Sequence, residues 1–260
     1  MELTLYQVDA FTHRRFRGNP AAVVPLEAWL PDAMLQDIAQ ENNLAETAFF
    51  VPEGDGFRLR WFTPTIEVDL CGHATVASAH VLYEHLGYQK DRIEFQSRSG
   101  LLSVERKNAQ YVLNFPTDTI TKVENNTLLA EALGVTPVEV FQGKTDWLVI
   151  LEEQAQIEAL KPDLRKIAEA GGRGTIVSAL GKAVDFVSRC FFPQSGVDED
   201  SVTGSAHTTL APYWSKRLGK NELSAQQLSK RGGDLSIKLL DHRTEIGGAA
   251  VTYLVGKIWI

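Results

Sequence analysis

The sequence predicts an α+β fold of two similar lobes, each a mixed β-sheet or barrel wrapped round a central helix. Short strand-like runs outnumber helical patterns and do not alternate with them regularly, which argues against a doubly wound parallel sheet. A glycine-headed helical pattern occurs twice, and a polar, turn-rich stretch at 116–126 reads as a linker between the two halves.

The first half predicts a helix within a set of strands. Strands are expected at 3–11, 21–24, 45–51, 57–63, 91–96, 101–106 and 110–115, and helices at 31–41 and 72–86. The helix at 72–86 is apolar nearly all round in its first turns, so it should be buried. Its polar start, with Cys71, Gly72 and His73, suggests a site at that end.

The second half predicts the same kind of arrangement. Helices are expected at 127–134, 154–160 and 163–170, and strands at 137–142, 145–151, 175–179 and 183–192, with a loop at 171–174. A further helix ends at Leu218, and Pro212 inside it predicts a kink or a restart. The remainder, 222–260, reads mainly as strands, with turns at 232–233 and 247–248.

The two glycine-headed helices form an internal repeat. A shift of 132 places 71–87 on 203–219, and five of these 17 positions are identical, namely Gly72/Gly204, Ala74/Ala206, Ala79/Ala211, Leu86/Leu218 and Gly87/Gly219. Glu67, before the first helix, falls on Glu199. We therefore expect lobes at 1–116 and 117–249, with a cleft between them. Two helix N-termini facing that cleft would suit a small carboxylate-bearing substrate.

Composition narrows the classes of function. The formal net charge of −7 argues against non-specific nucleic-acid binding, which needs clustered Lys and Arg. No apolar run approaches the length that spans a bilayer, and the first residues do not resemble a signal peptide. Two cysteines are too few for a disulfide scaffold. A cytoplasmic protein with reduced thiols is expected.

An ordered set of motifs resembles the phenazine-biosynthesis-like (PhzF) family over essentially the whole chain. The motifs are Phe16–Ala21, Asn43–Phe49, Phe62–Pro64, Glu67–Thr75 and Asp200–His207. The resemblance implies the diaminopimelate epimerase-like fold, with the C-terminal strand, about 250–260, returning to the first lobe. It also makes a homodimer the expected assembly.

The resemblance implies roles for particular residues. Glu46 corresponds to the proton-transferring base, and His73 and Asp200 assist it or hold the substrate. Gly72, Gly204 and Ser205 would line the substrate, and Asn19 matches a position that contacts substrate in the epimerases. Without the resemblance, Glu46 could equally be a solvent-facing position of a strand, and Asp200 an acidic residue favoured by a helix dipole. The sequence departs from the family at Ser201, often Pro, and at Ala45, where phenazine-producing members have Ser.

Three hypotheses follow. The first is a cofactor-independent isomerase that moves a carbon-bound proton of a small carboxylic acid with Glu46. The second is an epimerase or racemase that uses Cys71, which occupies the place of a catalytic thiol in the epimerases. The third is a non-catalytic small-molecule-binding protein on the same fold.

Cysteine and histidine spacing bears on these alternatives. The segment that matches Cys71 contains no second thiol, and Cys190 lies in an apolar strand, so both cysteines are expected to be buried core residues. His80 and His85 are five apart, which should not place them on one helix face. We expect no metal and no organic cofactor.

Overall fold

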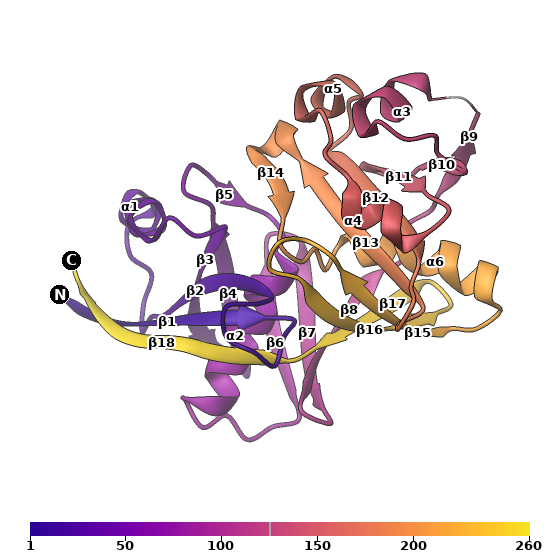
Figure 1. The fold of residues 1–260 in the computed structure, drawn as a ribbon. Coiled ribbons are helices and arrows are strands. Elements are labelled where there is room, and N and C mark those ends of the chain that lie inside the picture. Colours follow the sequence, from indigo (N-terminus) through magenta and orange to yellow (C-terminus); the bar gives the residue numbers. More distant parts are fainter. Residues whose placement is uncertain (125) are drawn as a thin grey trace. The chain divides into compact units, whose positions relative to one another are not determined.

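The computed structural model describes residues 1–124 and 126–260 and divides the chain into two compact units (Figure 1). The first unit comprises Met1–Asn114 with Gly247–Ile260, and the second comprises Phe115–Ile246. The sequence analysis places these boundaries at 116/117 and about 250. No helix among the described residues is long and apolar enough to cross a membrane.

The first unit is a mixed sheet. Its strands are β1 (Glu2–Ala10), β2 (Asn19–Pro25), β3 (Glu46–Glu53), β4 (Gly56–Phe62), β5 (Glu67–Val68), β6 (Arg92–Ser97), β7 (Gly100–Lys107), β8 (Gln110–Pro116) and β18 (Ala250–Trp259). β2 pairs with β3, and β4 with β6, in parallel; the remaining printed neighbours are antiparallel. The C-terminal strand β18 runs along β1 over its full length (Figure 1).

Helix α2 (Gly72–Glu84) is the core of this unit, as its apolar sequence predicts. Every residue from His73 to Leu82 is buried, and the helix packs against β1, β2, β3, β7 and β18. Helix α1 (Asp32–Asn42) covers a separate cluster that includes Leu35, Phe49 and Phe62. The start of α2 therefore combines a core position with polar chemistry.

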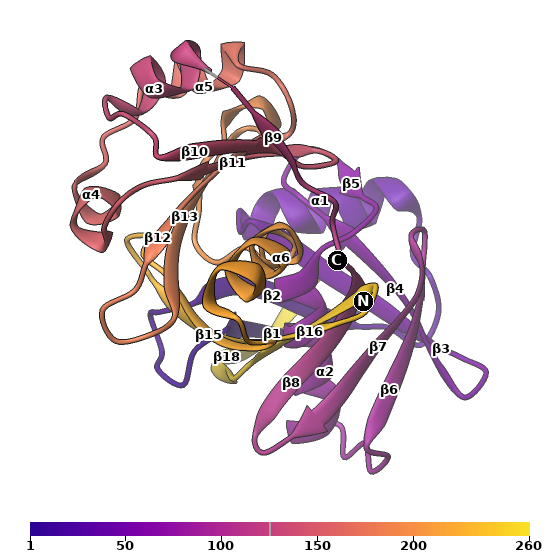
Figure 2. The same ribbon diagram turned by 90° about the vertical axis from the view of Figure 1, so that its right-hand side faces the viewer.

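The second unit repeats this plan. Its strands are β9 (Thr121–Val123), β10 (Glu139–Gln142), β11 (Asp146–Ile150), β12 (Gly174–Leu180), β13 (Phe186–Phe192), β14 (Val197–Asp200), β15 (Glu222–Gln227), β16 (Gly233–Leu240) and β17 (Arg243–Gly248), whose last two residues belong to the first unit. Its short helices are α3 (Thr127–Leu133), α4 (Gln154–Ala159), α5 (Leu164–Glu169) and the 3-10 turn η1 (Pro193–Ser195). Figure 2 shows its long helix α6 (Ala206–Leu218) beside β15 and β16, against which it packs.

Strand pairing confirms that the units have the same topology. β11 and β12 are parallel, as are β13 and β15, which matches β2/β3 and β4/β6 of the first unit. In each unit an arginine on the long strand binds the glutamate of the short strand that precedes the central helix. Arg60 Nε lies 2.7 Å from Glu67 Oε1, and Arg189 Nε lies 2.7 Å from Glu199 Oε1. The predicted correspondence of the two glutamates is thus a correspondence of two ion pairs.

Helix α6 is continuous through Pro212, so of the two expectations, a kink or a restart, the restart is wrong. Proline removes the N–H that would bond the carbonyl four residues earlier, which here belongs to Thr208. The backbone N–H of Asp118 donates to that carbonyl at 3.2 Å. A neighbouring loop therefore replaces the missing bond, and the helix does not need to break.

Two turn predictions are wrong. Residues 121–123 of the expected linker form β9, which pairs with β10, while residue 125 of that stretch lies outside the described residues. Gly247 and Gly248 belong to β17 rather than to a turn. A Cβ on Gly248 would lie 2.4 Å from Cδ1 of Phe11, so this glycine serves close packing.

Candidate functional site

In the first unit, Asn19 and Glu46 open two neighbouring parallel strands, β2 and β3. Because parallel strands begin at the same edge of a sheet, these side chains share one edge. Gly18 permits this placement: it has a φ of +65°, and a Cβ there would lie 2.1 Å from the Ala10 carbonyl oxygen. Gly72 and His73 begin α2, whose first N–H groups have no partner within the helix.

His73 is the centre of this group. Its Nε2 lies 3.2 Å from Glu46 Oε2, its Nδ1 lies 3.2 Å from Asn19 Nδ2, and Cys71 Sγ lies 3.5 Å from Nδ1. The side chains of His73 and Glu46 are 7% and 19% exposed. His73 Nε2 and Glu46 Oε2 are buried atoms that make no well-aligned hydrogen bond, even to each other, among the described residues. Two proton-carrying atoms are therefore adjacent, and no third group in the described part of the chain binds them.

The contact with Asn19 fixes the neutral tautomer. An amide nitrogen can only donate, so His73 Nδ1 accepts and the neutral ring carries its hydrogen on Nε2, toward Glu46. Burial lowers the pKa of His73, but Cys71 and Glu46 outweigh burial and raise it well above 6.5. Burial also raises the pKa of the Cys71 thiol to about 11, so the thiol is neutral at neutral pH. Glu46 is the second group that favours a protonated His73.

Glu46, Cys71 and His73 are also close enough to be considered as metal ligands. However, Cys71 faces Nδ1 of the imidazole, whereas Glu46 faces Nε2. One metal ion binds an imidazole through one nitrogen, so the three groups would have to rearrange to share an ion. The arrangement is that of a line of proton donors and acceptors.

In the second unit, Asp200 and Ser205 flank the turn into α6. Thr203 Oγ1 donates to Asp200 Oδ2 at 2.6 Å, and the Gln227 amide bridges this turn by donating to the Asp200 carbonyl and accepting from Thr203 N. Gln227 is fully buried and was not predicted from the sequence. Gly204 and Ser205 follow directly, and Ser205 is the N-cap residue of α6.

Arg173 and Asp146 complete this group and were also missed. Arg173 Nε donates to Asp146 Oδ1 at 2.8 Å, Nη2 donates to Asp146 Oδ2, and Nη2 also donates to Ser205 Oγ at 3.2 Å. The signal in the sequence was the loop Gly171–Gly174, which carries an arginine between glycines. Cys190 is buried, as expected, but it pairs with Asp200 across β13 and β14.

His80 and His85 contact the same residue of β18, although their spacing does not place them on one helix face. Both Nε2 atoms contact the Thr252 hydroxyl, at 2.8 Å and 2.7 Å. Helix α2 ends at Glu84, and His85 is its C-cap residue. Burial is the main cause that lowers the pKa of His80 to about 4, so it is a neutral structural residue at neutral pH.

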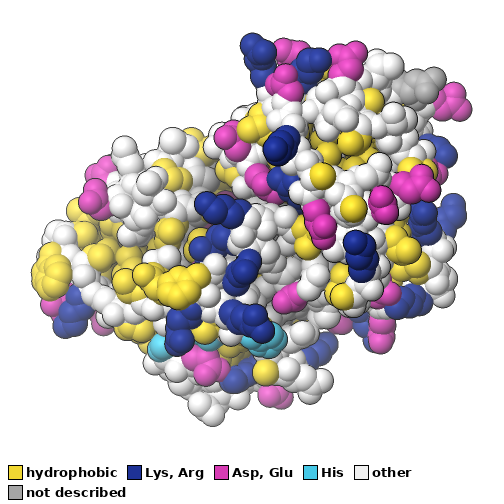
Figure 3. All heavy atoms as spheres, in the orientation of Figure 1, with side chains coloured by type: hydrophobic (Ala, Val, Ile, Leu, Met, Phe, Trp, Pro, Cys, Tyr) yellow, Lys and Arg dark blue, Asp and Glu magenta, His cyan; other side chains and the backbone are white. Residues whose placement is uncertain are grey.

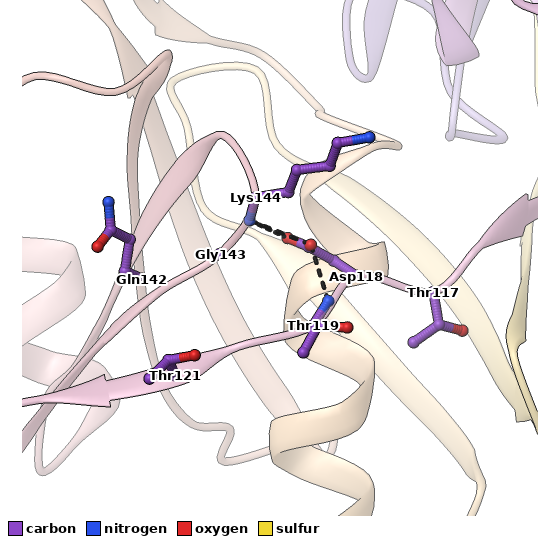
Figure 4. Close-up of a pocket in the computed structure, with 7 residues that line it drawn as sticks. All are labelled: Thr117, Asp118, Thr119, Thr121, Gln142, Gly143 and Lys144. Atoms are coloured by element: carbon purple, nitrogen blue, oxygen red, sulfur yellow. Dashed lines mark hydrogen bonds between the residues drawn. The ribbon is translucent and has the colours of Figure 1, made fainter.

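A cavity of about 460 Å³ in the second unit contains none of the candidate residues (Figure 4). Asp118 projects into the group of residues that line it and accepts hydrogen bonds from the backbone N–H groups of Thr119 and Lys144. Its carboxylate also accepts from Thr209 Oγ1, at 2.9 Å. Asp118 therefore holds the loop against α6.

The repeated units identify the class of fold. The chain superimposes on a structure of a predicted epimerase from Pseudomonas aeruginosa with a TM-score of 0.81 and 20% identity, covering 99% of both chains. This likeness shows an epimerase-type fold.

The family is narrower than the fold. The family model described as "Phenazine biosynthesis-like protein" (PhzC-PhzF) matches residues 8–256. A protein named an uncharacterized isomerase of Pseudomonas aeruginosa is 50% identical over 258 residues, 99% of each chain. A crystal structure of a PhzF-family protein from Enterococcus faecalis is 44% identical, has a TM-score of 0.98, and covers all of both chains. The chain belongs to the PhzF family, as the resemblance predicts.

Proposed function

We propose that the protein is a cofactor-independent isomerase of a small carboxylic acid, with Glu46 as the acid and base. The observation that carries this proposal is the pair Glu46 Oε2 and His73 Nε2, buried and 3.2 Å apart without a well-aligned hydrogen bond. A buried polar atom without a well-aligned hydrogen bond is costly, and a catalytic role is one explanation for its presence. A relative that is named an isomerase supports the same class of reaction.

The proposed reaction is a transfer of one proton between two carbon atoms. The Glu46 carboxylate removes an acidic proton, the C–H bond breaks, and its electron pair enters the unsaturated system of the substrate. Glu46 then returns the proton to another carbon and is regenerated. The Nε2–H of His73 would donate to the negative charge of the intermediate.

Each unit offers its own candidate substrate contacts. In the first, the N–H groups at Gly72 and the start of α2 would hold a carboxylate, and Asn19 would position His73. In the second, Gly204 and Ser205 would bind the substrate and Asp200 would assist in proton transfer.

Solvent-deuterium exchange tests this function. Small carboxylates, including ring-containing and amino-acid-like ones, are first screened by thermal shift, and those that stabilise the protein are incubated with it in D₂O. We expect deuterium in at least one acid, and at least about a hundredfold slower incorporation with Glu46→Gln. Glu53→Gln is the matched control, because Glu53 ends the same strand and pairs with exposed Arg58. Undiminished exchange in Glu46→Gln would refute the role of Glu46.

Epimerisation by Cys71 is the second candidate. Cys71 Sγ lies 3.5 Å from His73 Nδ1, so a proton could pass between them. The raised pKa of the thiol disfavours a resting thiolate. Inversion of configuration in a recovered chiral acid, lost in Cys71→Ser, would favour this alternative. A protein that binds an acid without exchanging any proton would favour the third, non-catalytic hypothesis.

We also propose a homodimer, formed through the C-terminal strand. Hydrophobic side chains gather over β1 and β18 (Figure 3), and the most exposed on β18 are Val255 and Trp259, at 56% and 75%. Light scattering should give twice the chain mass of 28.8 kDa, and Val255→Lys should shift it toward the monomer. A wild-type mass equal to one chain would contradict the dimer.

A further inference from the structure

Two arginines of the second unit are held in the same way but are used differently. Each forms a two-point ion pair with one carboxylate, and each guanidinium lies 5.1 Å from the ring centre of a phenylalanine on β13. Arg189 pairs with the carboxylate of Glu199. Arg189 Nη1 also donates to the carbonyls of Ile157 and Leu160, at 3.2 Å and 2.9 Å. Arg189 is 13% exposed, and all of its nitrogens are engaged, so its role is structural.

Arg173 keeps part of its guanidinium unused. Its Nε and Nη2 bind Asp146, Nη2 also reaches Ser205, and Nη1 donates to no group in the described part of the chain. The Arg173 side chain is 40% exposed, while Asp146 is 2% exposed. A buried carboxylate thus fixes the orientation of a cation whose remaining edge is open.

The loop that carries Arg173 is built around this position. Gly172 has a φ of +75°, and a Cβ on it would lie 2.9 Å from the Thr145 carbonyl oxygen. A Cβ on Gly174 would lie 2.1 Å from Phe192 Cδ1. A larger residue at Gly172 or Gly174 would therefore require the surrounding atoms to move. The Arg173 backbone N–H donates to the Thr145 carbonyl at 2.7 Å. This accounts for the glycine-rich loop that the sequence shows.

The contact with Ser205 orients a second donor. A guanidinium has donors only, so the Ser205 oxygen accepts from Arg173. The hydroxyl hydrogen of Ser205 must then point to a different acceptor. Arg173 Nη1 and the Ser205 O–H together offer donors to one group, and the partner that matches such an arrangement is a carboxylate.

We propose that Arg173, held by Asp146, binds a carboxylate of the substrate together with Ser205 and sets the preference for an acid over its neutral amide. This inference rests on the proposed function, in that it assumes Ser205 contacts the substrate. Arg173 touches the substrate directly, and Asp146 is a positioning residue.

Binding of acids and of their neutral diamides tests the proposal. Succinate, glutarate and phthalate are each compared with the corresponding diamide by calorimetry against the full-length protein. We expect wild-type protein to bind at least one acid at least about tenfold more tightly than its diamide. Arg173→Lys should reduce this preference by weakening the binding of the acid, with the affinity for the diamide unchanged. Arg189→Lys is the matched control and should keep the preference.

Further variants cover the case in which Arg173→Lys does not fold, since it could leave Asp146 poorly paired. The double variant Asp146→Asn/Arg173→Gln removes both charges together, and Ser205→Ala leaves the ion pair in place. Both should reduce the preference at least about threefold. Retention of the full preference in the folded variants overturns the proposal, as does a wild-type protein that binds none of these acids. The role of Glu46 is judged separately by deuterium exchange, so the two can fail independently.

Discussion

Replacement of Glu46 by Gln should lower the pKa of His73. Glutamine keeps the shape of the side chain and removes its charge, 3.2 Å from His73 Nε2. Two unit charges at that distance interact by about 5 kcal/mol at an effective dielectric constant of about 20, and by about 1.3 kcal/mol in water. A neighbouring opposite charge favours the charged form, and both groups are largely buried, so we expect the pKa of His73 to decrease.

The measurement is an NMR titration of the imidazole nitrogens of wild-type protein and the variant, with the His73 signals assigned by His73→Asn. Burial opposes protonation of His73, and Cys71 and Glu46 favour it. Removal of Glu46 should leave burial opposed by Cys71 alone. Glu53→Gln should leave the titration of His73 unchanged. An unaltered midpoint in Glu46→Gln would refute the reasoning that Glu46 controls the charge of His73.

Replacement of Glu46 by Gln should also change how the free energy of unfolding depends on pH. The folded pKa of His73 lies above its unfolded value near 6.5, so the stabilisation is fully present below pH 6.5. It is lost as the pH rises through the folded pKa. Chemical denaturation should therefore show a larger cost of Glu46→Gln at pH 6 than at pH 9, and an equal cost at both values would contradict the assignment.

Three further changes follow from the structure. Cys71→Ser should retain deuterium exchange within about twofold, because a thiol with a pKa near 11 is not the resting base; a loss above about a hundredfold would indicate a catalytic thiol. The pKa of buried His80 is lowered to about 4, so its folded form resists protonation and stability should fall as the pH drops from 6.5 to 4; His80→Gln should make that fall shallower in denaturation experiments. Gly248→Ala should destabilise the protein by about 1–3 kcal/mol, measured by thermal unfolding, because its Cβ would overlap Phe11; an unchanged melting temperature would show that Phe11 moves freely.

The repeat was predictable because both central helices retain a glycine at their start and apolar residues after it. Gly72 and Gly204 stand at equivalent helix starts, and burial leaves little freedom at the apolar positions that follow. The partners of the preceding glutamates were not predictable. Arg60 lies seven residues before Glu67, whereas Arg189 lies ten before Glu199, because the second unit inserts the turn η1 between the two strands.

The chemistry of the second unit was harder to predict for a similar reason. Arg173 and Ser205 are 32 residues apart and come together through the loop before β12, and Asp146 comes from the preceding strand, β11. Nothing in a local pattern connects them. Cys190 reads as an apolar strand residue, and only the pairing of β13 with β14 places it opposite Asp200.

The two units share a backbone arrangement but differ in the residues at the start of the central helix. Cys71 and Thr203 occupy equivalent positions, and the carbonyl of each accepts from the side chain four residues later, Thr75 Oγ1 in one unit and His207 Nδ1 in the other. Cys71 stands beside a histidine, but the Thr203 hydroxyl donates to Asp200. A mechanism with two thiols needs an acid–base group at both positions, and a threonine whose hydrogen is already donated cannot supply one. The divergence therefore favours proton transfer by Glu46 over epimerisation by paired cysteines.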